Sequence, residues 1–181
     1  MVTGTDLIVD FVNSLEHNVQ DARDVELLDS PAALVAWLAE RELLEPPAPA
    51  TDGDLAHARA LREALRDLLG SHNELEADVA GAGAVLDETA RRAGLGVRFA
   101  GDAARLQPSA GGVDGALGHV LAAVAAAMDD GTWPRLKVCR ADDCLWAYLD
   151  TAKNRSRAWC SMQSCGNRAK VRAYRGRRAT T

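Results

Sequence analysis

The sequence predicts a mainly α fold of the α+β class, in which a helical N-terminal domain with one small hairpin precedes a small C-terminal domain built around four cysteines. Three observations lead to this prediction. Apolar residues recur at helical spacing through most of the N-terminal part, one short segment alternates like a strand, and every cysteine lies in the last quarter of the chain. The length of 181 residues, with 48% apolar and 26% charged residues, suits one or two globular domains.

Three helices are predicted in the first half of the chain. Apolar residues over positions 7–15 form the broad face of a short amphipathic helix. Ser30-Pro31 supplies an N-cap and a first-turn proline for a second helix. After a proline-rich break at 46–49, a capping pattern at 51–54 begins a long third helix, which we expect to run to about residue 79.

A small hairpin and one more helix complete the predicted N-terminal domain. Apolar and polar residues alternate around Arg98, and Gly101-Asp102 then offers a turn, so a hairpin is expected within residues 94–107. Apolar residues over 117–128 again repeat at helical spacing, which indicates a helix that packs against the earlier ones.

Trp133-Pro134 marks the expected domain boundary, which divides the chain into residues 1–132 and 133–181. Within the second domain, the aromatic and apolar content of residues 145–149 is typical of a strand. Residues 151–159 are predicted to form a short helix. A last helix is expected from the final cysteine almost to the C-terminus.

The cysteines form two Cys-x4-Cys pairs with fifteen residues between them: Cys139 with Cys144, then Cys160 with Cys165. Zn²⁺ prefers four thiolates in a tetrahedron, and two short-range pairs bring them together with little further loop closure. Gly166 permits a tight turn in which backbone N–H groups approach the sulfurs. The pattern therefore predicts a four-cysteine zinc finger with one structural zinc ion. The alternative, two disulfides, requires an oxidising compartment.

The net charge of −5 conceals a division between the two ends of the chain. Residues 134–181 carry twelve Lys or Arg against three Asp, whereas residues 1–133 carry nine against twenty-three acidic residues. A basic end beside a metal site favours DNA as partner, although it is also possible that these cations only solvate the terminus or neutralise the acidic part. A stripe of Arg168, Arg172 and Arg175 is expected on one face of the last helix. The candidate nucleic-acid-binding residues are Arg168, Lys170, Arg172, Arg175, Arg177 and Arg178.

The sequence offers no convincing catalytic site, so we expect that the protein is not an enzyme. Its histidines are scattered, and a zinc ion held by four cysteines has no open coordination position. The N-terminus lacks the basic start and cleavage site of a signal peptide, and the longest apolar run, 120–128, is too short for a membrane span. A cytoplasmic protein without membrane contact is therefore expected.

Four polar residues, Asp6, Asp10, Asn13 and His17, share one face of the first predicted helix. Such a face is usually solvated. The sharper hypothesis is that Asp10 and Asn13 line a pocket for a small-molecule effector or contact the other domain.

The sequence around the cysteines resembles the CGNR zinc finger. This resemblance rests on Cys165-Gly166-Asn167-Arg168, on the preceding Trp159-Cys160-Ser161-Met162, and on Cys144-Leu145-Trp146. Upstream, the stretch Asp10-Phe11-Val12-Asn13 is similar to the ABATE domain, which usually precedes that finger.

The resemblance implies a bacterial cytoplasmic regulator of transcription in the stress response, whose finger binds DNA. It also implies the same four cysteines as zinc ligands, with Asn167 and Arg168 completing the signature. Ala158 stands where many relatives have a further basic or polar residue, which would slightly weaken contacts with a DNA backbone.

We therefore expect a DNA-binding transcription regulator whose N-terminal domain senses a signal or forms a homodimer. A dimer is attractive because one finger has a small footprint on DNA. The alternative is a zinc-finger module that binds protein or RNA without DNA specificity. We also expect that removing zinc unfolds the finger and leaves much of the N-terminal domain folded.

Overall fold

A computed structural model gives the fold of residues 4–16 and 24–179, with side chains described as far as Arg175. Over these residues the helices are α1 (Gly4–Val12), α2 (Pro31–Glu40), α3 (Asp52–Ser71), α4 (Val79–Ala93), α5 (Gly112–Asp129) and α6 (Asn167–Ala179). Antiparallel pairs join β1 (Leu15–Glu16) to β2 (Val25–Glu26), β3 (Gly96–Ala100) to β4 (Ala103–Gln107), and β5 (Leu136–Val138) to β6 (Ala147–Leu149). The predicted α+β class is thus confirmed.

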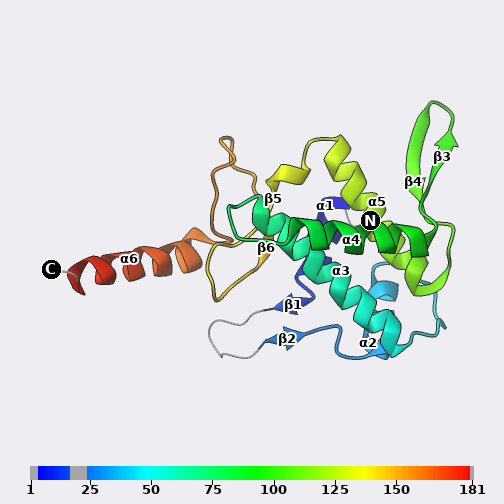
Figure 1. Cartoon of the computed structure of the whole chain (residues 1–181), viewed down its shortest axis with the longest axis horizontal. Coiled ribbons are helices and arrows are strands. Elements are labelled where there is room, and N and C mark those ends of the chain that lie inside the picture. The colour runs from blue at the N-terminus through cyan, green and yellow to red at the C-terminus, as the bar shows by residue number, and fades with distance from the viewer. Residues whose placement is uncertain (1–3, 17–23, 180–181) are drawn as a thin grey trace.

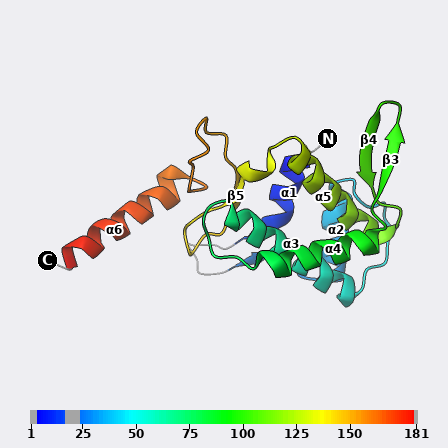
Figure 2. The same cartoon turned by 45° about the horizontal axis from the view of Figure 1, so that its top comes forward.

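The first five helices pack together, and two elements extend from the resulting body in different directions. The β3–β4 hairpin stands out at one end, and α6 projects from the opposite end, beyond the β5–β6 pair (Figure 1). The same arrangement is visible after rotation (Figure 2). Among the described residues, no helix has the length and apolar character needed to cross a membrane.

Two predicted helix starts are confirmed by their caps. The Ser30 hydroxyl accepts a hydrogen bond from the Ala33 N–H at 3.2 Å, and Pro31 occupies the first turn of α2. At the start of α3, Thr51 and Asp54 form a reciprocal capping box, with bonds of 3.2 and 2.8 Å. Each cap satisfies N–H groups that the helix leaves without a partner.

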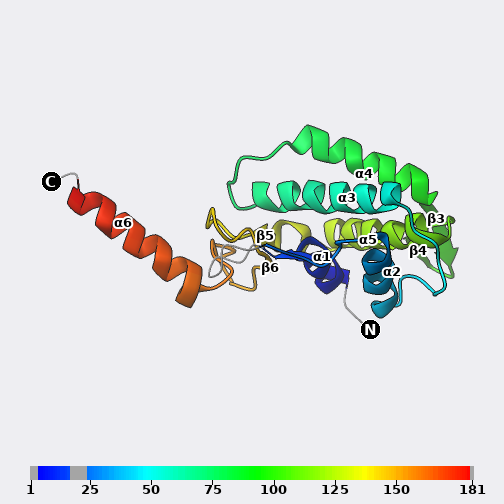
Figure 3. The same cartoon turned by 90° about the horizontal axis from the view of Figure 1, so that it is seen from below.

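The third helix was predicted to reach residue 79, and this was wrong because α3 ends at Ser71. Glu74 adopts a φ of +61°, which no helix interior accepts. Nearby, the Asn73 side chain donates to the Val138 carbonyl at 2.7 Å. The helix ends here because this long-range contact outweighs local helix propensity. Helix α4 then begins after Asp78, whose carboxylate accepts from the Gly81 N–H at 2.9 Å, and runs back along α3 (Figure 3).

The short helix predicted over residues 151–159 was also wrong, because this segment is a loop. Buried Asp150 organises it by accepting hydrogen bonds from the N–H groups of Ala152 and Arg157, at 2.9 and 3.0 Å. Lys137 pairs with Asp150 at 2.8 Å and also donates to the Arg155 carbonyl at 2.6 Å. One buried ion pair thus replaces the hydrogen bonds that a helix would have made.

The main core lies between α1, α2, α3 and α5, and the C-terminal domain takes part in it. Leu136 and Val138 of β5 and Ala147 of β6 are buried in this core. A second, smaller core contains Cys139, Ala141, Cys144, Tyr148 and Cys165. The β5–β6 hairpin therefore connects the two cores, which fixes the cysteines relative to the helical body.

Candidate metal centre and nucleic-acid interface

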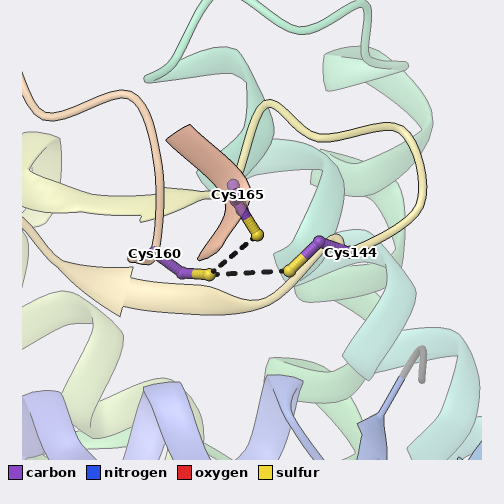
Figure 4. A group of neighbouring side chains, drawn as sticks. Cys144, Cys160 and Cys165 are labelled. Carbon is purple, nitrogen blue, oxygen red and sulfur yellow. Dashed lines mark hydrogen bonds between the residues drawn. The ribbon is translucent and has the colours of Figure 1, made fainter. Parts of the chain in front are cut away.

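The four cysteine sulfurs meet in one cluster, and all four atoms lie within 4.8 Å of one another. The Cys160 sulfur lies 3.6 Å from the sulfur of Cys144 and 3.6 Å from that of Cys165, and these three side chains point toward one another (Figure 4). A zinc ion with Zn–S bonds of about 2.3 Å requires tetrahedral S–S edges of about 3.8 Å. The cluster therefore fits a single structural zinc ion.

Each half of the cluster is shaped by backbone turns. Cys139 follows β5 directly, and its N–H donates to the Trp146 carbonyl at 2.9 Å. The Cys144 N–H closes a turn onto the Ala141 carbonyl at 2.9 Å. Cys165 lies in a π-helical turn, Met162–Gly166, just before α6.

Gly166 lies in a closely packed turn. A Cβ atom there would lie 2.4 Å from the Met162 sulfur, which is the flexible end of a half-exposed side chain and could move, and 3.2 Å from the Trp159 ring, which would have to shift slightly. The glycine of the Cys-Gly-Asn-Arg sequence therefore lets Met162 and Trp159 pack closely at the turn that carries Cys165.

Because the four sulfurs lie close together, the pKa values of the cysteine thiols shift in different directions. The pKa of the Cys139 thiol is lowered because Cys144 and Cys160 hydrogen-bond to its sulfur. The pKa values of Cys144 and Cys160 are raised, first by their hydrogen bonds to Cys139 and then by burial and by its charge. One thiolate thus opposes the formation of the next. A divalent cation removes this repulsion, because it stabilises all the thiolates together.

Arginine neutralises part of the charge that such a cluster carries. The Arg168 guanidinium donates to the Cys165 sulfur at 3.2 Å, and Arg157 donates to the Cys160 carbonyl. Arg140 instead turns to the helical body, where it donates to the Asn73 carbonyl at 2.7 Å and pairs with Glu74. Arg168, the arginine of the Cys-Gly-Asn-Arg sequence, therefore belongs to the metal centre.

Buried polar side chains of the body fasten the C-terminal domain. Both ends of the Asn13 amide bind the Ala147 backbone, as donor to its carbonyl at 3.0 Å and acceptor from its N–H at 2.8 Å. Arg66 donates to the carbonyls of Leu145 and Val12 at 2.8 and 2.6 Å. The end of α1, helix α3 and the cysteine domain are thus held together by hydrogen bonds in which these buried polar groups find partners.

Asp10 and Asn13, proposed from the sequence as partners in one site, have different neighbours. Asp10 is exposed and lies 3.7 Å from Arg41, whereas buried Asn13 contacts β6. The structure therefore does not bring the two side chains together. His17, on the same predicted face, lies outside the described residues.

The predicted arginine stripe of α6 is partly engaged within the protein. Arg168 and Arg172 both approach Asp143, at 3.6 and 2.7 Å. Lys170 and Arg175 are exposed. The side chains of Arg177 and Arg178 lie outside the described part of the chain, although the backbone of α6 extends past them. Arg172 is nevertheless exposed, with 55% of its side chain open, so two members of the predicted stripe, Arg172 and Arg175, face solvent.

The loop that follows β6 carries two further exposed cations, Lys153 and Arg155, which the sequence reasoning left out. The sequence predicted a short helix over this segment and placed all candidate nucleic-acid-binding residues on the last helix. The sequence feature that could have identified these two cations is the run Lys153-Asn154-Arg155, which lies between the two cysteine pairs. Because the Lys137–Asp150 pair holds the loop, these side chains project from a fixed backbone.

Two family models match the chain. The model of the ABATE family, described as "putative stress-induced transcription regulator", matches residues 5–130, and the model of the CGNR zinc finger matches residues 135–178. Among proteins with curated descriptions, none matches the chain. The chain belongs to the ABATE family and carries a CGNR zinc finger at its C-terminal end.

Proposed function

We propose that the protein is a DNA-binding transcription regulator whose zinc finger holds two cationic elements, the loop 151–156 and helix α6, for contact with DNA phosphates. The observation that supports this most strongly is the position of four exposed cations that form no ion pair among the described residues of these two elements: Lys153, Arg155, Lys170 and Arg175. The loop is held by the Lys137–Asp150 pair of the β5–β6 hairpin and α6 follows Cys165, so a zinc ion bound by the four cysteines would fix α6 relative to the loop. The family description adds transcription and stress to this proposal.

The zinc ion would have a structural role in this function. It would supply the charge that keeps four thiolates together, and a closed four-sulfur shell leaves no position for a substrate or an attacking water. The residues of this chain then do the binding. We accordingly propose a regulator, not an enzyme, which acts in a bacterial cytoplasm.

Distribution of charge gives the proposed complex a preferred orientation. The helical body carries most of the acidic residues, and the cationic elements lie at the opposite end from the β3–β4 hairpin (Figure 1). DNA would therefore attract the zinc finger and repel the body. Arginine at these positions can also read guanine edges, which would add sequence preference to phosphate attraction.

A protein partner is the second candidate, and exposed apolar residues favour it. Val171 on α6 is 47% exposed, and Met162 in the turn before α6 is 50% exposed. Such residues suit a protein interface better than a phosphate backbone. RNA binding would instead depend on stacking of unpaired bases on aromatic side chains.

Salt dependence of binding separates these possibilities. We expect the zinc-loaded protein to bind random-sequence duplex DNA in a fluorescence-anisotropy titration, with log K falling against log salt at a slope of roughly −4, as about four phosphate contacts require. Lys153→Ala, Arg155→Ala, Lys170→Ala and Arg175→Ala should each reduce the magnitude of that slope by about 0.9.

Arg91→Ala is the matched control, because Arg91 is an exposed cation of α4, with a side chain 72% exposed. Its removal should leave the slope unchanged. A shallow slope that no cation variant alters, together with loss of binding in Val171→Ala, would instead support a protein-binding finger. Preference for single-stranded RNA over the duplex would support the RNA alternative.

A further inference from the structure

One carboxylate in the loop between Cys139 and Cys144 lies against two arginines of α6. Asp143 binds the Arg172 guanidinium through Oδ2 at 2.7 Å, and its Oδ1 lies 3.6 Å from Arg168. The two arginines are four residues apart in α6, so they share one face of the helix. A single aspartate thus neutralises part of the charge on the face that the sequence predicted for DNA.

The two arginines differ in what else holds them. Arg168 donates to the Cys165 sulfur at 3.2 Å, so the metal centre fixes it. Arg172 has 55% of its side chain exposed, and among the described residues its ion-pair partner is Asp143 alone. An ion pair that is open to water is weak, because water screens both charges. Arg172 is therefore the cation that another anion can bind in place of Asp143.

The two oxygens of the Asp143 carboxylate are used unequally. Oδ1 is buried and accepts no hydrogen bond from the described residues, since 3.6 Å to Arg168 is longer than a hydrogen bond. Oδ2 accepts the hydrogen bond from Arg172. Exchange of this one contact for another anion would therefore separate the carboxylate from Arg172.

We propose that Asp143 competes with a DNA phosphate for Arg172, and so lowers the attraction of the zinc finger for a DNA backbone of any sequence. This inference rests on the proposed DNA binding and names a residue that limits it. In the free protein, the carboxylate occupies the position at Arg172 that a phosphate would take, and its negative charge repels a phosphate nearby. Base contacts must then supply a larger share of the affinity for a specific site.

The neighbouring residue Asp142 offers a comparison of equal charge. It lies in the same loop, is exposed, and forms no ion pair among the described residues. Asp142→Asn and Asp143→Asn change the net charge by the same amount. A difference between the two variants therefore reports the contact with Arg172 and not the net charge.

Fluorescence-anisotropy titration of the full zinc-loaded chain with random-sequence duplex DNA tests the proposal. Asp143→Asn should steepen the slope of log K against log salt by about 0.9, because Arg172 then adds one phosphate contact. At 0.1 M salt this corresponds to roughly eightfold tighter binding. Asp142→Asn should tighten binding by about twofold at most, through a repulsion that salt screens.

Arg172→Ala separates competition from a change in the position of α6. By itself it should leave the slope unchanged, because Asp143 already occupies this arginine in the unaltered protein. Combined with Asp143→Asn, it should remove the whole gain in affinity. Both single variants break the same ion pair, so a gain that appears only in Asp143→Asn does not come from loosening of the helix. Zinc content and circular dichroism verify that each variant keeps its fold.

Three results would overturn the proposal while leaving DNA binding itself in place. Equal effects of Asp143→Asn and Asp142→Asn would show that net charge alone matters. Weaker binding of Asp143→Asn would show that the carboxylate positions Arg172 for DNA. A shallower slope for Arg172→Ala alone would show that this arginine contacts DNA despite Asp143. Absence of duplex binding by the unaltered protein and by every variant would instead overturn both this proposal and the proposed function.

Discussion

At the residue scale, Asn13 joins the helical body to the zinc finger through a single amide. Its carbonyl and amino groups both pair with the Ala147 backbone, and only 8% of its surface is exposed. Helix α1 ends at Val12, and Asn13 is the next residue. Of the alternatives that the sequence left open for Asn13, which were a solvated face, an effector pocket and a contact with the other domain, the structure shows the contact with strand β6.

Replacing Asn13 by Asp should destabilise the protein by about 2 to 3 kcal/mol. The aspartate keeps the shape, but it loses the donor and places an acceptor oxygen against the Ala147 carbonyl. Urea unfolding of the zinc-loaded protein measures this loss. Asp10→Asn is the matched control, because Asp10 is exposed on the same segment. Its effect should remain within about 0.5 kcal/mol. Equal effects of the two substitutions would contradict a special role for Asn13.

At the element scale, the sequence predicted best those features that depend on nearby residues. The caps at Ser30 and Thr51 and the hairpin at 96–107 are local, and each is present. The end of α3 and the loop after β6 depend on Asn73 and on the Lys137–Asp150 pair, whose partners are far away in the sequence. Helix α4 was missed because the residues it buries are small, Ala82, Thr89 and Ala93, in place of the large apolar residues that mark the other helices.

The candidate site follows the same rule. The cysteine spacing predicted which four residues meet, because metal ligation limits their arrangement strongly. The arginine stripe followed from helical periodicity, which places residues on a common face but does not show what that face contacts. The structure shows Asp143 against Arg168 and Arg172. An ion pair between distant segments cannot be predicted from periodicity alone.

The contact between β2 and α3 makes a pH-dependent contribution to stability. Glu26 binds the Arg62 guanidinium through both carboxylate oxygens, at 2.7 and 2.8 Å. Burial alone would raise the pKa of Glu26, but hydrogen bonds from Arg62 and the Leu28 N–H outweigh it and lower the pKa below its ordinary 4.5. A lowered pKa means that the stabilisation is fully present above that ordinary value and is lost as the pH falls through the folded pKa.

We therefore expect Glu26→Gln to cost about 2 kcal/mol at neutral pH, and this cost should shrink below pH 4.5. The measurement is the difference in unfolding free energy between the two proteins across the pH range. Taking the difference cancels contributions that both share, such as protonation of the thiolates. A cost that is the same at pH 7 and at pH 3, about 1.5 units below the ordinary pKa of 4.5, would argue against this ion pair.

At the scale of the whole molecule, the zinc finger is not separate from the body. Leu136, Val138 and Ala147 are buried in the main core, whereas the cysteines form a second core on the other side of the β5–β6 hairpin. The β5–β6 hairpin is thus stabilised by both cores, whereas α6 is stabilised only by contacts around the second core. The residues after β6 depend mainly on the cysteine cluster, on Asp150 and on Asp143 for their position.

Removal of zinc should therefore unfold only part of the C-terminal domain. We expect chelation to release residues 160–179, because four thiols without a cation cannot hold the π-helical turn and α6 in place, whereas the Lys137–Asp150 pair holds the loop before them. The β5–β6 hairpin should stay folded, because apolar burial and the bonds from Asn13, Arg66 and Asn73 fix it to the body. Hydrogen exchange measured by mass spectrometry before and after chelation gives this result segment by segment. Cys165→Ser should reproduce the effect, and Ser164→Ala, an exposed neighbour, should not. Loss of protection at β5 together with α6 would show that the finger unfolds as one unit, and retained protection in α6 would show that zinc does not hold the helix.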